Sequence, residues 1–149
     1  MVPAKGIEDL AERFGARNVS RAEWTHEAHL AVGLWYVARY GADEAFARLR
    51  VGIRALNEAN GVANTPTGGY HETITHAYVV LIATFLERRG VTLRSPDRDV
   101  QCEVDALLQG PLADRAVLFE HWSRERLMSP EARAGWVEPD VRALPSRPT

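Results

Sequence analysis

Hydrophobic residues recur three and four positions apart along most of this chain, a period that predicts amphipathic helices. No stretch alternates apolar and polar residues as a half-buried strand does. The expected class is therefore all-α, an antiparallel bundle of four main helices with short C-terminal helical pieces and an irregular tail. A short helix comes first, near residues 7–14, and the main helices are expected at residues 20–40, 43–60, 70–89 and 95–110.

Local signals place the ends of these helices. Ser20 and Glu23 have the spacing of a capping box, which predicts that the first main helix begins there. Asp43 and Thr67 are suitable N-caps for the second and third. Gly41 follows the first helix as a left-handed stop.

Beyond the fourth main helix the pattern weakens. Residues 112–122 predict a fifth, shorter helix, and Ser129 followed by Pro130 predicts one further turn. Residues 136–149 contain too many prolines for regular structure, although Trp136 and Val137 could dock this tail over an opening in the bundle. With 149 residues, we expect one helical domain over 1–149, with 1–19 as an N-terminal short helix or arm and 136–149 as a Pro-rich tail.

The net charge, the cysteine count and the absence of long apolar runs disfavour several classes of function. The formal net charge of -2 gives no broad attraction to nucleic acid or anionic lipid. A single cysteine, Cys102, allows neither an internal disulfide nor a cysteine-based zinc cluster, which favours a reducing compartment. The first residues are too charged for a signal peptide and no apolar run is long enough to span a bilayer, so we expect a cytoplasmic protein.

Four of the five histidines lie in two short segments, residues 24–29 and 65–76. The very short link between the first two main helices forces them to be nearly antiparallel, and the third follows in the same sense. The start of the first, the end of the second and the start of the third then meet at one end of the bundle. The residues expected to cluster there are His26, His29, Asn57, Asn60, His71, Glu72 and Thr75.

The same end would attract an anion. Thr67, Gly68 and Gly69 precede the third helix, where backbone amides and the helix dipole suit a carboxylate, phosphate or oxyanion. Arg50 borders the inner face of the second helix and could hold an acidic ligand.

Two chemistries fit the histidine cluster. His26 and His29, three residues apart, could bind one divalent transition metal (Zn, Fe or Mn), with His71 as a third ligand from a facing helix. Without a metal, His71, Glu72 and His26 could act as acid and base groups, with Asn and Thr side chains orienting the substrate.

These residues support two hypotheses. The first is a small soluble enzyme that acts on a small polar or anionic metabolite through the histidine and glutamate cluster, with or without a metal. The second is a non-catalytic ligand-binding or interaction protein whose cluster is structural, because a buried histidine bonded to a backbone carbonyl is commoner than a metal ligand. In both, the expected partner is a small molecule and not nucleic acid or membrane, and a homodimer is allowed.

The segments Trp24-Thr-His-x-x-His-Leu30 and Thr65-x-Thr-Gly-Gly-Tyr-His-Glu-Thr-x-Thr75 and the tail from Ser129 to Asp140 form a recognisable combination. The chain resembles a group of small uncharacterised bacterial helical proteins, and this resemblance implies a helical fold but no particular activity. It also has a coarser likeness to the DinB-like helical bundles, whose members often hold a metal through three histidines. The histidine spacing of this chain departs from their pattern.

Overall fold

Helices and the turns between them make up the computed structural model, which describes residues 6–145. No strand occurs in this part of the chain, so the all-α prediction is confirmed. Residues 1–5 of the expected arm and 146–149 of the expected tail lie outside the described residues. The elements in chain order are α1 (Gly6–Gly15), α2 (His26–Tyr40), α3 (Ala42–Ala59), α4 (Glu72–Arg88), α5 (Gln101–Leu108), the 3-10 turns η1 (Pro111–Ala113) and η2 (Val117–Glu120), α6 (Arg124–Leu127) and α7 (Pro130–Ala134).

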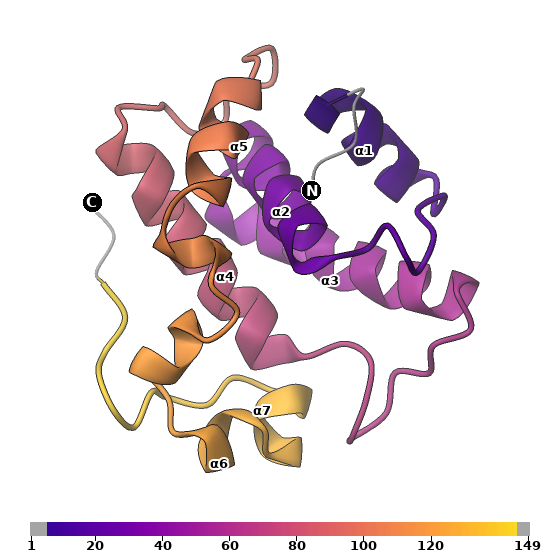
Figure 1. Cartoon of the computed structure of the whole chain (residues 1–149), viewed down its shortest axis with the longest axis vertical. Helices are drawn as coiled ribbons and strands as arrows, with labels where there is room; N and C mark the ends of the chain where they lie inside the picture. Colours follow the sequence, from indigo (N-terminus) through magenta and orange to yellow (C-terminus); the bar gives the residue numbers. More distant parts are fainter. Residues whose placement is uncertain (1–5, 146–149) are drawn as a thin grey trace.

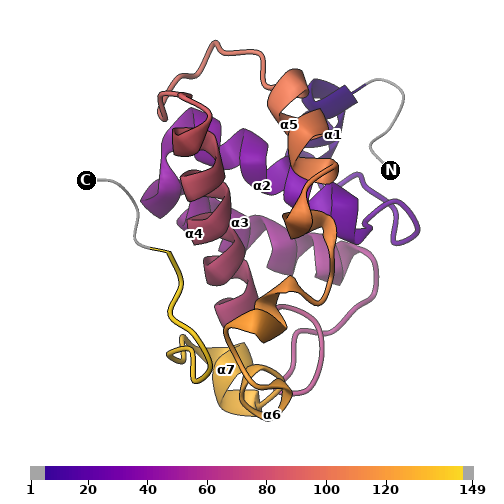
Figure 2. The ribbon, with the colours of Figure 1, turned by 60° about the vertical axis from the view of Figure 1, so that its left-hand side comes forward.

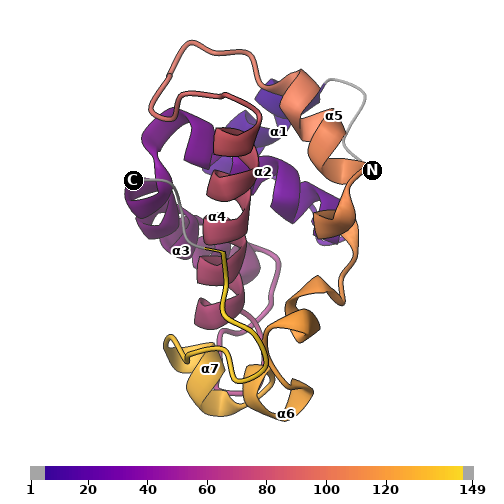
Figure 3. The ribbon, with the colours of Figure 1, turned by 90° about the vertical axis from the view of Figure 1, so that its left-hand side faces the viewer.

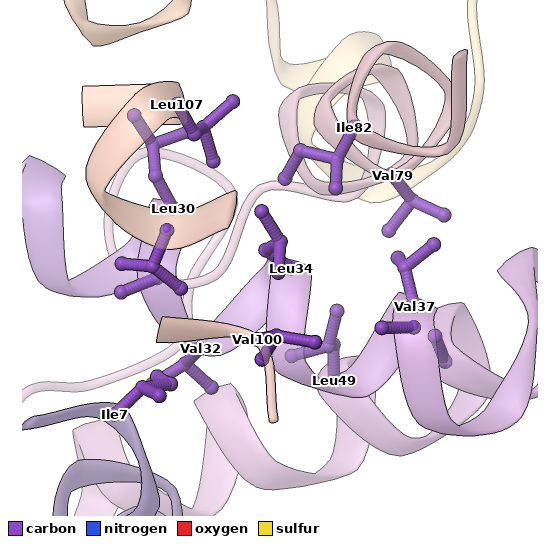
Figure 4. Close-up of a cluster of buried hydrophobic side chains, with 14 of the residues drawn as sticks. Ile7, Leu30, Val32, Leu34, Val37, Leu49, Val79, Ile82, Val100 and Leu107 are labelled. Carbon is purple, nitrogen blue, oxygen red and sulfur yellow. The ribbon is translucent and has the colours of Figure 1, made fainter. Parts of the chain in front are cut away.

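Helix α2 is the centre of the main core, because it packs against α1, α3, α4 and α5. Its two apolar sides bury Leu30, Ala31 and Leu34, each with no more than 1% of its surface exposed. Figure 4 shows side chains of α2 facing Leu107 of α5 and Ile82 of α4. Four main helices, α2 to α5, thus pack together as expected.

The molecule is elongated, and its two ends are built differently. Helices α1 and α5 lie toward one end of the long axis, and α6 and α7 lie at the other, below the start of α4 (Figures 1 and 3). Helix α4 crosses α2 and α3, as Figure 2 shows. No helix within residues 6–145 has the length and apolar character needed to cross a membrane.

Residues 111–145, the C-terminal segment, form a second apolar cluster around the fully buried Trp122, together with Ala77 and Leu81 of α4. The indole Nε1 of Trp122 donates a hydrogen bond to the carbonyl oxygen of Val137 at 3.0 Å. The Val137 amide donates in turn to the Thr73 hydroxyl of α4 at 3.2 Å, and Trp136 packs edge-on against Trp122. Docking through Trp136 and Val137 is therefore confirmed, but neither residue lines the hollows described below.

The predicted start of α2 is wrong by about one and a half turns. The capping box forms, since Glu23 N donates to Ser20 Oγ at 3.2 Å and Ser20 N to the Glu23 carboxylate at 3.0 Å, but it closes an isolated turn. Arg13 of α1 binds the same carboxylate at 2.6 Å and holds that turn against α1. The N-cap of α2 is Thr25, whose hydroxyl accepts from Ala28 N.

Other predicted boundaries also need correction. Helix α3 begins at Ala42, with Gly41 as N-cap in place of Asp43. Helix α5 begins at Gln101 and not near residue 95, because Ser95 N bonds to the Ala38 carbonyl oxygen and holds that stretch against the end of α2. Residues 112–122 form two 3-10 turns and no continuous helix, because Asp114 closes a turn by accepting from Ala116 N.

Candidate functional site: adjoining hollows beside α2, α3 and α4

A pocket of about 410 Å³, here called the apolar hollow, lies between the bundle and the C-terminal segment. Its walls are mostly aliphatic and aromatic, with a few polar groups among them. The exposed Met128 and Arg115 stand at its rim. The lining residues are Trp24, His26, His29, Leu30, Gly33, Leu49, Ile53, Ile74, Thr75, Tyr78, Val79, Ile82, Arg115, Leu118, Phe119, Leu127 and Met128.

A second pocket of about 460 Å³, the polar hollow, adjoins the first. Six of the residues predicted to form the site line it: His29, Asn57, Asn60, Gly69, His71 and Thr75. The two hollows share five lining residues, which we call the seam: Trp24, His29, Ile53, Ile74 and Thr75. The start of α2, the end of α3 and the start of α4 therefore do meet around one space.

His29 stands at the seam with a defined tautomer. Its ring contacts the Trp24 ring in a tilted arrangement, with the centroids 3.9 Å apart, and its Nδ1 lies 2.8 Å from the carbonyl oxygen of Thr25. A carbonyl can only accept, so Nδ1 carries the proton and Nε2 keeps a lone pair. The ring is exposed to the hollow, whose protein walls replace part of its water. This desolvation lowers the pKa of His29 to about 4, and the positive charge of Arg115 acts in the same direction.

His26 faces the apolar hollow from the first turn of α2. Its Nε2 lies 3.2 Å from the carbonyl oxygen of Leu112 and donates to it, which ties α2 to η1. The ring meets Tyr78 edge-on at 5.6 Å. Burial raises the pKa of Tyr78 to about 12, and the nearby Asp114 carboxylate adds to the effect, so the Tyr78 phenol is neutral at physiological pH.

His71 is the N-cap of α4, the role that the sequence assigned to Thr67. Its Nδ1 accepts from Ile74 N at 3.1 Å, and its Nε2 donates to the carbonyl oxygen of Leu127 at 2.7 Å. Burial lowers the pKa of His71, which favours the neutral ring that this pair of bonds requires. With both ring nitrogens bonded to main chain, His71 joins α4 to α6.

Glu72 lies outside both hollows and lines a third pocket together with Arg50. The two side chains form a bidentate ion pair, with N to O distances of 3.0 and 2.6 Å, and the Tyr70 hydroxyl donates to the same carboxylate at 2.7 Å. Burial works against the charge on Glu72, but these hydrogen bonds outweigh it and lower the pKa of the carboxyl. Glu72 is therefore ionised and held in place.

The amides in the polar hollow have structural partners. Asn57 donates to the side-chain oxygen of Asn64 at 3.0 Å, and Asn60 donates to the carbonyl oxygen of Val19 at 2.9 Å. Asn64 also accepts from Tyr70 N, so it organises the loop before α4.

Thr75 differs from these amides, because it lies at the seam and its oxygen can still accept a hydrogen bond. Its hydroxyl donates to the carbonyl oxygen of His71 at 2.8 Å, and the oxygen keeps its lone pairs at the seam.

The glycine-rich stretch does not form the predicted anion site at a helix start. Thr67 and Gly68 belong to a tight turn closed by Thr65 and lie several residues before α4 begins. Gly69 lines the polar hollow at a backbone φ of +80°, and a Cβ there would lie 2.5 Å from the Ala63 carbonyl oxygen. Glycine is therefore required at 69 to shape the loop.

The three histidines proposed as metal ligands have separate roles. Each of His26, His29 and His71 bonds a different main-chain carbonyl. Within residues 6–145 no group of three His, Cys, Asp or Glu side chains is placed to hold a metal ion, so the predicted site for Zn, Fe or Mn is not confirmed.

Sequence reasoning missed several lining residues. Arg54 lies four residues, about one helical turn, after Arg50. This spacing indicates that both side chains lie on the same face of the helix. Arg115, Met128 and Arg133 line their hollows from the C-terminal segment, where the periodic pattern is too weak to indicate which side chains face the bundle.

Comparison of the chain with protein-family models, with curated proteins and with solved structures finds no match. The resemblances drawn from the sequence segments therefore stay expectations.

Proposed function

We propose that this protein binds a small molecule with an apolar body and one neutral hydrogen-bond-donating group, such as an alcohol or a phenol. The observation that carries the proposal is the seam, where the apolar and polar hollows share five lining residues. A volume of about 410 Å³ is in the size range of ligand pockets, which are mostly apolar with a few oriented polar groups. The apolar hollow would take the ligand's body and the seam its polar group.

Two acceptors at the seam define that polar group. His29 Nε2 has a lone pair because its Nδ1 proton goes to the Thr25 carbonyl oxygen. Thr75 Oγ1 has lone pairs because its own proton goes to the His71 carbonyl oxygen. A hydroxyl group can donate to either, whereas a carboxylate has no proton to give. An ionised group of either sign would also lose its hydration in this mostly apolar hollow.

The contacts of the other candidate groups favour binding over catalysis. His71 uses both ring nitrogens to bond main chain, and Glu72 is held by Arg50 and Tyr70. A group that exchanges protons with a substrate needs an atom within hydrogen-bond reach of it. A catalytic role for His26, His71 and Glu72 stays a prediction, and the ligand-binding hypothesis requires none.

Calorimetric titration with 1-octanol tests the proposal. We expect saturable one-to-one binding, and we expect Ile53→Phe, which adds volume at the seam, to weaken it at least tenfold. Val51→Phe is the matched control, because residue 51 lies on the same helix, is 61% exposed and lines neither hollow. No saturable binding by the folded protein, or equal losses in both variants, would refute the proposal.

The donor requirement has its own test. Replacing His29 by leucine removes the acceptor, so 1-octanol should bind about fivefold more weakly, as loss of one neutral hydrogen bond predicts. Octanoate, which has the same chain but no proton at neutral pH, should bind the native protein more weakly than 1-octanol does. Tighter binding of octanoate, or an unchanged 1-octanol affinity in His29→Leu, would show that the polar group is of another kind.

A further inference from the structure

A third pocket, the arginine hollow, has a volume of about 340 Å³ and lies where α3, the start of α4 and α7 meet. Arg50 and Arg54 reach it from α3 and Arg133 from α7, while Glu72 is its one carboxylate. The remaining lining residues are uncharged: Asn64, Thr65, Pro66, Tyr70 and Ala134.

The charges in this hollow do not balance. The bidentate pair between Arg50 and Glu72 cancels one positive charge. Arg54 and Arg133 have no carboxylate within ion-pair distance among residues 6–145, so the hollow has a formal charge of +2. Two guanidinium groups beside one small space repel each other unless an anion lies between them.

The fold holds these groups in place. Arg133 Nη1 donates to the Gly69 carbonyl oxygen at 2.9 Å, which fixes the guanidinium on the loop before α4. Arg54 lies over the Tyr70 ring, with its guanidinium carbon 5.7 Å from the ring centroid. Tyr70 is itself fixed by the hydrogen bond from its hydroxyl to Glu72. Each guanidinium has more donors than these contacts use.

We propose that the arginine hollow is a second binding site, for an oxyanion with two negative charges such as a phosphoryl group. Guanidinium groups bind phosphate oxygens in forked pairs of charge-assisted hydrogen bonds, and a dianion neutralises both unmatched arginines where a monocarboxylate would leave one. The bound anion would join α3 to α7 and so hold the C-terminal segment on the bundle. The site shares none of the five seam residues, so it stands or falls separately from the proposed function.

Titration calorimetry on the full chain, at low ionic strength and slightly alkaline pH, tests this site with inorganic phosphate. We expect saturable binding that Arg54→Gln weakens about tenfold, as loss of a charge-assisted hydrogen bond predicts. Arg54 suits the test because its guanidinium contact here is with the Tyr70 ring, so its removal leaves the bonds of Arg50 and Arg133 intact. Arg98→Gln, an exposed arginine outside the hollow, is the matched control and should bind as the native chain does.

Two further probes define the ligand. Glycerol 2-phosphate binding at least as tightly as inorganic phosphate would indicate a phosphate ester as the occupant, and tighter binding of inorganic phosphate would indicate the free ion. Acetate at matched ionic strength should bind at least tenfold more weakly than either. The proposal is overturned if acetate competes equally, if Arg54→Gln and Arg98→Gln lose the same affinity, or if none of these phosphates binds.

Discussion

The helical bundle and the C-terminal segment are held together in different ways. Buried aliphatic side chains of α1 to α5 form one continuous core in the bundle. The C-terminal segment shares a smaller apolar cluster with Ala77 and Leu81 of α4, and side-chain to main-chain hydrogen bonds of His26, His71 and Thr73 add to this attachment. The apolar hollow lies between the two regions, and His26, which lines it, bonds across to the Leu112 carbonyl oxygen.

Truncating one core side chain in each region should have the largest effect. Leu34 and Trp122 are both fully buried, so Leu34→Ala and Trp122→Ala should each cost about 3–4 kcal/mol of unfolding free energy. Urea unfolding followed by far-UV circular dichroism measures these losses.

The two variants should also differ in which part of the molecule becomes sensitive to protease. Limited proteolysis of Trp122→Ala should cut first within residues 111–145 and leave a folded bundle, because the buried core of α1 to α5 includes no residue of that segment. Leu34→Ala should loosen the whole molecule. Identical cleavage patterns would show that the two regions unfold as one.

His71→Ala removes a link between α4 and α6 and should lower the free energy of unfolding by about 3 kcal/mol. It loses the N-cap of α4 and leaves the carbonyl oxygen of the buried Leu127 without its ring donor. His71→Asn keeps an acceptor for Ile74 N and should recover about 1 kcal/mol of that loss. Thermal or urea unfolding of both variants tests this, and equal stability of the two would mean that the capping bond contributes nothing.

Acidification should weaken the protein before its carboxylates titrate. Burial lowers the pKa of His29 to about 4 and also lowers that of His71, while an unfolded histidine has a pKa near 6.5. The unfolded chain therefore binds protons first, and stability should fall as pH decreases from about 6.5 to about 4. We expect the free energy of unfolding to fall by about 2 kcal/mol. This is less than the full value that the pKa differences imply, because the His29 ring is exposed to the hollow.

A series of urea unfolding curves across this pH range measures the loss. His29→Leu should flatten the dependence and leave only the part due to His71. A native chain whose stability does not change between these pH values would contradict the assigned desolvation of both rings.

The smallest expected effect comes from a pair of buried threonines on α4. Thr73 Oγ1 donates to the Gly135 carbonyl oxygen at 2.8 Å and accepts from Val137 N, so Thr73→Val should cost about 1.5 kcal/mol. Thr84 Oγ1 is buried with no hydrogen-bond partner among the described residues, so Thr84→Val should be neutral or stabilising by about 1 kcal/mol. Unfolding curves for the two variants should move in opposite directions, and a loss at Thr84 equal to that at Thr73 would contradict this difference.

The periodic pattern predicted the helices well and their starts poorly. Helical period depends on neighbours within the same segment, and α2, α3 and α4 lie where that pattern placed them. Starts depend on distant contacts. Arg13 holds Glu23 in a separate turn, and His71 caps α4 while its other nitrogen bonds Leu127 O from α6.

The candidate site was predictable to a similar degree. The short link between α2 and α3 and the expected order of the helices placed His29, Asn57 and Thr75 around one space, as the structure shows. The partners of His26 and His71 could not be foreseen, because the accepting carbonyl groups belong to the C-terminal segment, where the periodic pattern is weak. Arg133 reaches the arginine hollow from that segment for the same reason.

The most direct test of the central claim is an NMR measurement of where 1-octanol lies in the folded protein. Binding in the apolar hollow predicts intermolecular nuclear Overhauser effects from the alkyl chain to methyl groups of Leu30, Val79 and Ile82, and from the carbinol protons to the His29 ring. Overhauser effects confined to exposed side chains such as Val51 and Val141, or none at saturating 1-octanol, would contradict the account.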